Sequence, residues 1–219
     1  MTTAHPTAEM LAGYAGGSLS DGMSLLVASH LTFCPQCRSR VAQLETLCGA
    51  LLRDAAEATP SAACLAGALA RLDDDPTEPP APCAEPGCAL PAPLRLRIGV
   101  PASRIRWRFL LPGLAERRLH GFPGEEVRLV RARSGVGIPR HTHEGEEAML
   151  ILTGRLRDGE RVYARGDVAL ADGRDDHRPE VIGSETCVCL MVLTAPLRFT
   201  GPLGRVLNRL ARRVGFRTG

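Results

Sequence analysis

The sequence predicts an α+β multidomain protein, with a small N-terminal bundle of about four helices and a C-terminal antiparallel β-barrel. Three observations carry this prediction. Apolar residues recur at helical spacing in the first third of the chain and alternate at period two further on. Five prolines within the sixteen residues 73–88 separate the two patterns, and regularly spaced glycines punctuate the second half. A length of 219 residues accommodates one large or two modest domains.

Four helical segments are expected in the first half, each opened by a residue that favours a helix N-terminus. These residues are Thr7, Ser20, Pro35 and Ser61. The third segment carries an apolar stripe to about Ala55. The fourth places Leu65, Leu69 and Leu72 on one face, which fits either packing within the bundle or docking in the groove of a partner.

The second half is expected to form a small antiparallel barrel or sandwich. Charged and apolar residues alternate at 104–109 and 127–131, and unbroken apolar runs lie at 148–152 and 187–193. Only the basic tail, 204–216, returns to helical spacing, as expected for a helix that caps the barrel. A nucleic-acid or membrane-surface role for this tail is the alternative.

The expected organisation is a helical domain at residues 1–75, a proline-rich linker at 76–94 and a β domain with a C-terminal helix at 95–219. The net charge of +3 divides at the linker, since residues 1–80 hold nine Asp/Glu against four Arg, a net −5, and residues 81–219 hold fifteen against twenty-three, a net +8. The arginines of the second half alternate with apolar residues, which is typical of a sheet with one solvent-exposed face. This pattern disfavours direct nucleic-acid binding.

The composition also indicates where the protein resides. No apolar run approaches the roughly 20 residues that cross a bilayer, and the N-terminus lacks the order of a signal peptide. We therefore expect a cytoplasmic protein with no membrane partner. In that reducing compartment, the eight cysteines are expected to be metal ligands, redox groups or small buried residues rather than a disulfide framework.

A first group of candidate metal ligands is His30, Cys34 and Cys37. The imidazole and the first thiol lie one helical turn apart, and the second thiol follows three residues later at the start of the next helix. A structural zinc site normally takes four N and S ligands, and His5 is the only other histidine in this half. The alternative is that Cys34 and Cys37 are small core residues and that His30 caps a helix. The position of this histidine four residues before Cys34 disfavours the alternative.

The pattern His30-x3-Cys34-x2-Cys37, with the upstream His5, resembles the zinc-binding anti-sigma family over about residues 1–75. The resemblance implies that these four residues hold one zinc ion. It also implies a 1:1 complex with an extracytoplasmic-function (ECF) type sigma factor, which is kept from RNA polymerase, and it favours partner contact for the fourth helix. Four short helices have a meagre core, so a structural zinc is expected to supply much of the folding free energy.

A second group of donors, His141, His143 and Glu147, lies between Gly135 and Gly154. On a strand the two histidines point to the same face, and after a short turn the glutamate can return to that face on the next strand. The sequence therefore predicts three inward-facing metal donors, and a fourth is expected from a distant strand.

His177 supplies the fourth donor, ten residues after Gly166-Asp167. The two motifs together resemble the cupin family, whose three-His, one-Glu metal centre lies inside a conical barrel. The first motif matches throughout. The second departs from the family's pattern at Asp172 and Arg174, where the usual proline and glycine are missing, so the turn before His177 is expected to differ from the family's.

The metal in this centre is open on chemical grounds, because histidine and carboxylate donors accept zinc, iron, manganese, nickel or copper. The resemblance favours zinc here too, giving two zinc sites. It further implies that the cupin domain senses an oxidative signal, singlet oxygen, and triggers release of the sigma factor and transcription of stress genes. No enzymatic activity is expected on this interpretation. The alternative is a cupin dioxygenase or isomerase with iron in an open site, joined to a zinc-binding docking domain.

Cys187 and Cys189 are candidate redox residues, since they point to the same side of an apolar strand. A disulfide between them would be strained. If that side is the barrel interior, both thiols lie near the metal, where ionised and reachable thiols would be oxidation targets. Two small apolar strand residues are the alternative.

Overall fold

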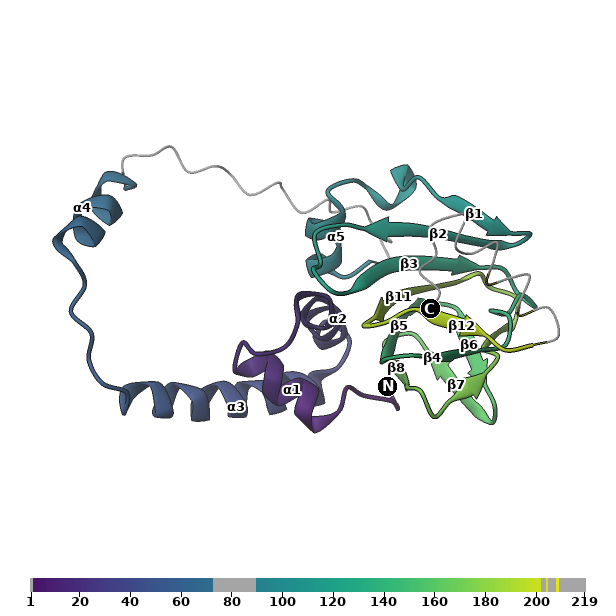
Figure 1. The fold of residues 1–219 in the computed structure, drawn as a ribbon, viewed down its shortest axis with the longest axis horizontal. Coiled ribbons are helices and arrows are strands. Elements are labelled where there is room, and N and C mark those ends of the chain that lie inside the picture. Colours follow the sequence, from purple (N-terminus) through teal and green to yellow (C-terminus); the bar gives the residue numbers. More distant parts are fainter. Residues whose placement is uncertain (1, 73–89, 202–203, 205–207, 209–219) are drawn as a thin grey trace.

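The structure, a computed structural model, describes residues 2–72, 90–201, 204 and 208 (Figure 1). The expected linker therefore lies outside the described residues as far as residue 89, and the expected tail helix does so apart from Gly204 and Asn208. The helices of the described part are α1 (Ala8–Ala15), α2 (Asp21–Leu31), α3 (Pro35–Arg53), α4 (Ala62–Ala70) and α5 (Ala92–Ile98), with one 3-10 turn, η1 (Ala102–Arg104). None of them is both long enough and apolar enough to cross a membrane.

The first four helices begin where the sequence predicts. The Thr7 hydroxyl accepts the Met10 amide N–H at 3.2 Å and caps α1, and Pro35 occupies the first turn of α3. Ser20 precedes α2 as expected but does not cap it, because its hydroxyl donates instead to Glu125 of the β domain at 2.6 Å. The fifth helix, α5, was not predicted; it lies where the linker was expected to end.

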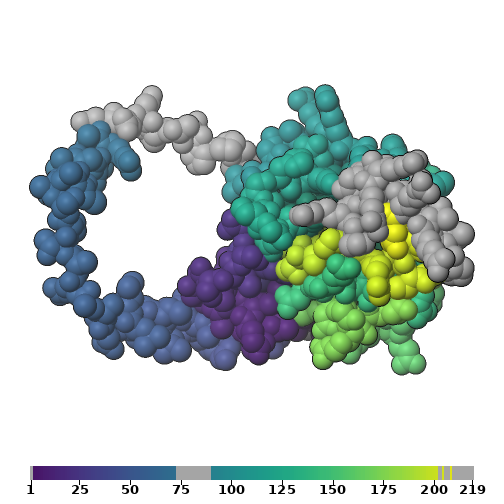
Figure 2. Space-filling model, in the orientation of Figure 1, coloured from purple at the N-terminus to yellow at the C-terminus, as the bar shows by residue number. Residues whose placement is uncertain are grey.

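α1, α2 and the first turns of α3 pack around a small apolar core. Its buried members are Leu11, Val27, Cys34, Cys37 and Val41. The helix α4 forms as predicted but buries no side chain, and it stands clear of the other helices together with the end of α3 (Figures 1 and 2). Of the two alternatives for this helix, packing within the bundle is therefore not the one observed.

The β domain consists of three antiparallel sheets. Its strands are β1 (Arg108–Leu111), β2 (Leu114–Leu119), β3 (Glu126–Ala132), β4 (His141–His143), β5 (Glu147–Thr153), β6 (Arg155–Asp158), β7 (Arg161–Ala164), β8 (Val168–Ala171), β9 (Asp176–His177), β10 (Glu180–Ile182), β11 (Cys187–Leu193) and β12 (Leu197–Phe199). The large sheet has the order β1-β2-β3-β11-β5-β8, and the smaller sheets have the orders β10-β6-β7 and β12-β4-β9. The predicted α+β class is confirmed, but the described strands form three sheets rather than the one closed barrel that was expected. The alternating stretch at 104–109 enters a strand only at Arg108.

The inner strands β5 and β11 of the large sheet are buried on both faces, which explains their unbroken apolar runs. One face points into the β domain and carries Met149, Ile151, Cys189 and Met191. The opposite face carries Leu150, Leu190 and Val192, which belong to one core with Leu26 of α2 and Leu94 of α5. The N-terminal helices thus cover the outside of the sheet whose inner face lines the β domain.

A close approach of backbone to side chain fixes α2 on the sheet. The Gly22 amide N–H donates to the Glu125 carboxylate at 2.8 Å. A Cβ atom at Gly22 would lie 2.7 Å from both that carboxylate and a methyl group of Val127, so a side chain there would push the helix away. The helical and β parts of the chain are therefore in direct contact at Gly22.

Candidate metal centres

The N-terminal candidate ligands converge at the junction of three helices. His5 precedes α1, His30 lies in the last turn of α2, and Cys34 and Cys37 lie at the cap and in the first turn of α3. The His5 Nδ1 atom is 3.4 Å from the Sγ atoms of both cysteines. One donor atom from each of the four residues lies within 4.8 Å of the others. The structure thus brings together all four residues that the sequence singles out.

The distances fit a tetrahedral metal ion. Ligands at about 2.0 Å (nitrogen) and about 2.3 Å (sulfur) from a tetrahedral zinc would lie about 3.5 Å apart, close to the 3.4 Å that separates His5 from each thiol. Burial raises the pKa of Cys34, but hydrogen bonds from Thr2 and Cys37 outweigh it and lower that pKa overall. Burial and the neighbouring Cys34 raise the pKa of Cys37 to about 12.

The tautomer of His30 also fits. Its Nδ1 atom lies 2.8 Å from the backbone carbonyl of Gly166 and must carry the proton, because a carbonyl can only accept. The Nε2 atom is buried and has no hydrogen-bond partner among the residues that the structure describes. Burial lowers the pKa of His30, so the ring is neutral. A buried, unpartnered imidazole nitrogen beside two thiols is what a metal site requires.

The second candidate centre lies inside the β domain, between the short strands β4 and β9 and the start of β5 in the large sheet. The Nε2 atom of His177 is 3.1 Å from that of His141 and 2.9 Å from that of His143. A Glu147 carboxylate oxygen lies 4.0 Å from His141 and 3.8 Å from His143. His141 pairs with His177 across β4 and β9, and Glu147 begins β5. The departures from the family's second motif therefore do not displace His177.

Burial shifts the pKa values of His141, His143 and Glu147 in this centre. It lowers the pKa of His141 to about 3 and that of His143 to about 4, so both rings are neutral at pH 7. Burial also raises the pKa of Glu147 to about 7, and neither of its oxygens has a hydrogen-bond partner in the described part of the chain. Three lone pairs and an unpartnered carboxylate in a buried position fit a cation, whose charge would offset this desolvation.

Two further groups orient the histidines. The Nδ1–H of His141 donates to the Pro139 carbonyl at 2.9 Å, and Nδ1 of His177 lies 2.6 Å from the Asp158 carboxylate. Both contacts turn an Nε2 atom toward the centre. Burial opposes the protonation of His177, but the hydrogen bond and charge of Asp158 outweigh it and raise the pKa of that histidine. No sequence motif points to Asp158, which comes from a different strand pair, at the end of β6.

Comparison with known proteins identifies the family. Residues 96–197 match the family model described as the ChrR cupin-like domain. The chain is 34% identical over 213 residues to the anti-sigma-E factor ChrR of Cereibacter sphaeroides, a match that covers 97% of this chain and all of the relative. The chain belongs to the ChrR family of anti-sigma factors. The ChrR chain in the crystal structure of Rhodobacter sphaeroides SigE in complex with the anti-sigma ChrR superimposes with a TM-score of 0.76 at 32% identity, covering 88% of this chain and 99% of that one.

Membership in the ChrR family confirms the fold that the two resemblances implied, a helical N-terminal part followed by a cupin-like domain. The two clusters of donor atoms found in the structure are the His5/His30/Cys34/Cys37 and His141/His143/Glu147/His177 sets. We call them the N-terminal centre and the cupin centre. Either donor set can hold a metal ion, and the thiolates of the N-terminal centre favour zinc over the hard cations.

Cys187 and Cys189 point into the β domain, as the hypothesis that they are redox residues requires. Both are buried and free, and the Cys189 thiol contacts the Met149 sulfur at 3.6 Å. Burial raises the pKa of Cys187 to about 12 and raises that of Cys189 as well. The redox hypothesis requires thiols that are ionised and reachable. In this conformation the two thiols are neither.

We expect Cys187 to resist alkylation in the folded protein. At pH 8 a thiol with a pKa of about 12 is ionised in about one molecule in ten thousand, against about one in four for an ordinary thiol. Iodoacetamide labelling followed by peptide mass spectrometry should therefore modify Cys187 at least about a thousandfold more slowly than the exposed Cys64 of the same chain. Equal labelling rates would show that the strand opens readily.

Proposed function

We propose that the chain is an anti-sigma factor that binds one ECF-type sigma factor through its N-terminal helices and releases it when the cupin-like domain senses an oxidant, singlet oxygen. The relative that this chain matches over its full length is named an anti-sigma-E factor, and the similar crystal structure contains ChrR in a complex with SigE. Release would allow transcription of stress genes. We place this regulator in the cytoplasm, with no direct nucleic-acid contact and no membrane contact.

The observation that carries the proposal is a set of exposed leucines at the end of α3, along α4 and just after α4. We call it the leucine surface, and its members are Leu47, Leu51, Leu52, Leu65, Leu69 and Leu72. Each of these side chains is more than half exposed. The end of α3 and the whole of α4 stand clear of the rest of the described molecule (Figure 2), and exposed leucines on such helices are typical of a protein-binding surface.

Zinc in the N-terminal centre would hold the three packed helices in the arrangement that binds the sigma factor. The core they bury is small, and a metal ion that crosslinks α2, α3 and the segment before α1 would substitute for the missing apolar area. We assign this role to His5, His30, Cys34 and Cys37, within a domain that ends near residue 75.

The cupin centre would be the sensor, with a second zinc ion held by His141, His143, Glu147 and His177. Cys187 and Cys189 lie in the same interior and would become targets of the oxidant once the centre is disturbed. The alternative is an enzyme, a cupin dioxygenase or isomerase. Metal analysis separates the two, because the regulator should contain two zinc ions per chain and the enzyme one zinc and one redox-active iron.

The first test is co-purification. Each ECF-type sigma factor encoded in the host genome is co-expressed with the tagged chain, and one of them should be recovered with it at a 1:1 ratio. If none is retained under conditions in which the chain carries its metals, the anti-sigma proposal fails.

Replacing one leucine of the leucine surface should weaken this complex. Leu69→Asp places a carboxylate where an apolar contact forms, and we expect binding at least about thirtyfold weaker, the size of a central interface contact. Leu96→Asp on α5 is the matched control, because both side chains are 54% exposed and only the first lies on the leucine surface. Titration calorimetry with the co-purified sigma factor measures both. Equal affinities for the two variants would place the interface elsewhere.

A further inference from the structure

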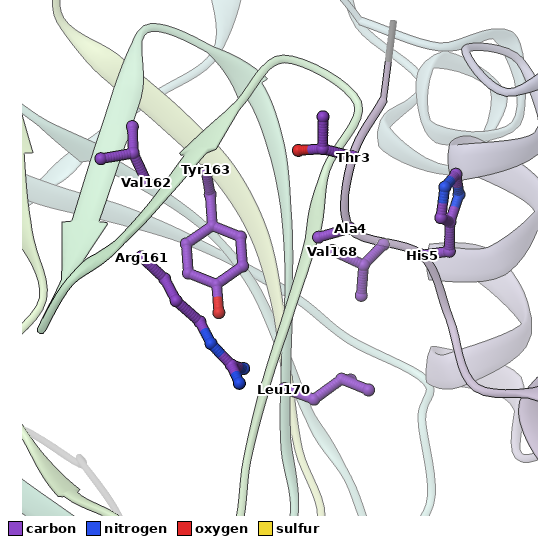
Figure 3. Close-up of a pocket in the computed structure, with 8 residues that line it drawn as sticks. All are labelled: Thr3, Ala4, His5, Arg161, Val162, Tyr163, Val168 and Leu170. Carbon is purple, nitrogen blue, oxygen red and sulfur yellow. The ribbon is translucent and has the colours of Figure 1, made fainter.

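The segment that leads to His5 is held by the cupin-like domain. The backbone N–H groups of Thr3 and Ala4 donate to one oxygen of the Asp167 carboxylate, at 2.6 and 3.1 Å. The amide of Val168 in turn donates to the Ala4 carbonyl at 3.0 Å. Figure 3 shows this segment running alongside the strand of Val168, with His5 on the side of the helices. The residue immediately before a metal ligand of the N-terminal centre is therefore bonded like an added strand.

The same turn of the cupin-like domain orients a second ligand. The carbonyl of Gly166, adjacent to Asp167, accepts the Nδ1–H of His30 and leaves Nε2 for the metal. Asp167 is 2% exposed and uses its other oxygen to accept the Ala164 amide at 2.9 Å, which fixes the carboxylate within its own turn. Two of the four ligands of the N-terminal centre thus have their supporting hydrogen bonds in the other domain.

The turn is shaped for this contact. Gly166 has φ +92°, and a Cβ atom there would lie 2.6 Å from the Thr2 methyl group and 2.9 Å from the Phe33 Cβ atom. Arg165 covers the other side of the junction, with its guanidinium 5.0 Å from the centre of the Phe33 ring. A residue with a side chain at Gly166 would separate the domains at the point where His30 is held.

The strand that follows this turn leads to the cupin centre. β8 begins at Val168, bonded to Ala4, and ends at Ala171, whose partner on β5 is Glu147. Its residues Val168 and Leu170 also line, with His5 and Tyr163, a cavity of about 410 Å³ between the domains (Figure 3). One short strand therefore joins the backbone that positions His5 to a donor of the other centre.

We propose that the cupin-like domain completes the N-terminal metal site, with Gly166 and Asp167 as positioning residues for His30 and His5. Binding of the metal and docking of the two domains then stabilise each other, because each fixes the same His5 and His30 geometry. A shift of β8 at the cupin centre would weaken the hold on the N-terminal metal. This inference rests on the metal site assigned above, and it does not depend on the identity of the partner.

The test is Co²⁺ binding by full-length protein with Asp167 replaced. Only the N-terminal centre contains cysteines, so thiolate-to-cobalt absorption reports that centre alone. We expect Asp167→Ala to lower its Co²⁺ affinity, measured by competition with a chelator, about ten- to a hundredfold. Asp167→Asn, which keeps one acceptor oxygen, should restore part of it. The control is Glu180→Ala, which removes a half-exposed carboxylate whose ion pair with Arg157 lies on the surface. Wild-type affinity in folded Asp167→Ala would overturn the proposal.

Hydrogen exchange decides the matter if Asp167→Ala fails to fold. In Cys37→Ala, which removes a ligand of the N-terminal centre only, the amide of Val168 should exchange faster than in the metal-loaded wild type, while the amides of β11 exchange at unchanged rates. Unchanged exchange at Val168 would show that the metal and the docking are independent, and would overturn the proposal. Because no sigma factor is present in either experiment, such a result leaves the anti-sigma function to its own test.

Discussion

Replacing both Cys34 and Cys37 with alanine is expected to remove one metal ion per chain and to abolish sigma-factor binding. Structural zinc binds with roughly 10–16 kcal/mol of apparent free energy, and this is comparable to the whole net stability of about 5–15 kcal/mol of an ordinary domain. The apolar core of α1, α2 and α3 is small. Without the metal, these helices should lose their fixed arrangement, while the β domain keeps its own core.

Metal analysis, circular dichroism and calorimetry with the co-purified sigma factor measure this effect. The control is Cys48→Ala with Cys64→Ala, which also removes two thiols but none of the clustered donors. The control should keep two metal ions and the circular dichroism of the wild type. A Cys34→Ala, Cys37→Ala protein that still forms an inhibitory complex would show that the helices need no metal.

The second large effect is expected at the cupin centre. His143→Ala should remove the other metal ion, leave sigma-factor binding intact and abolish release by singlet oxygen. The reason is that His143 supplies one of the three converging Nε2 atoms, and its loss leaves an incomplete donor set of two imidazoles and one carboxylate. Metal analysis measures the loss of the ion. Transcription from a sigma-dependent promoter, with and without a photosensitiser, measures sigma-factor binding and its release.

His120→Ala is the matched control, because this histidine is exposed and lies outside both centres. It should retain two metals and a normal response. If His143→Ala lost its metal and still responded to the oxidant, the sensor would have to be the N-terminal centre, where oxidation of Cys34 or Cys37 would expel the ion.

Local periodicity explains why two of the candidate donors in each centre could be placed together from the sequence. His141 and His143 lie two residues apart on a strand, and His30 and Cys34 lie one turn apart at a helix end, so each pair must share a face. The outcome for Cys187 and Cys189 followed in the same way once the inner face of β11 was known. Short-range spacing therefore accounts for these pairs, whereas His5 and His177 are distant in the sequence and were assigned with the help of the two family resemblances.

What the sequence could not predict depends on contacts between distant segments. Asp158 supports His177 from another strand pair, and the Gly166 carbonyl supports His30 from 136 residues away. The position of α4 could not be predicted for a related reason. An apolar helical face has the same sequence pattern whether it packs on the bundle or on a partner. These features follow from tertiary docking, for which one sequence carries no local signal.

Native mass spectrometry of the chain with its co-purified sigma factor tests the central claim most directly, because one spectrum reports the partner and the metals together. We predict a single complex of one chain, one sigma factor and two zinc ions, and no complex when Cys34 and Cys37 are replaced. A chain that carries both metal ions yet binds none of the ECF-type sigma factors of its host would contradict the account.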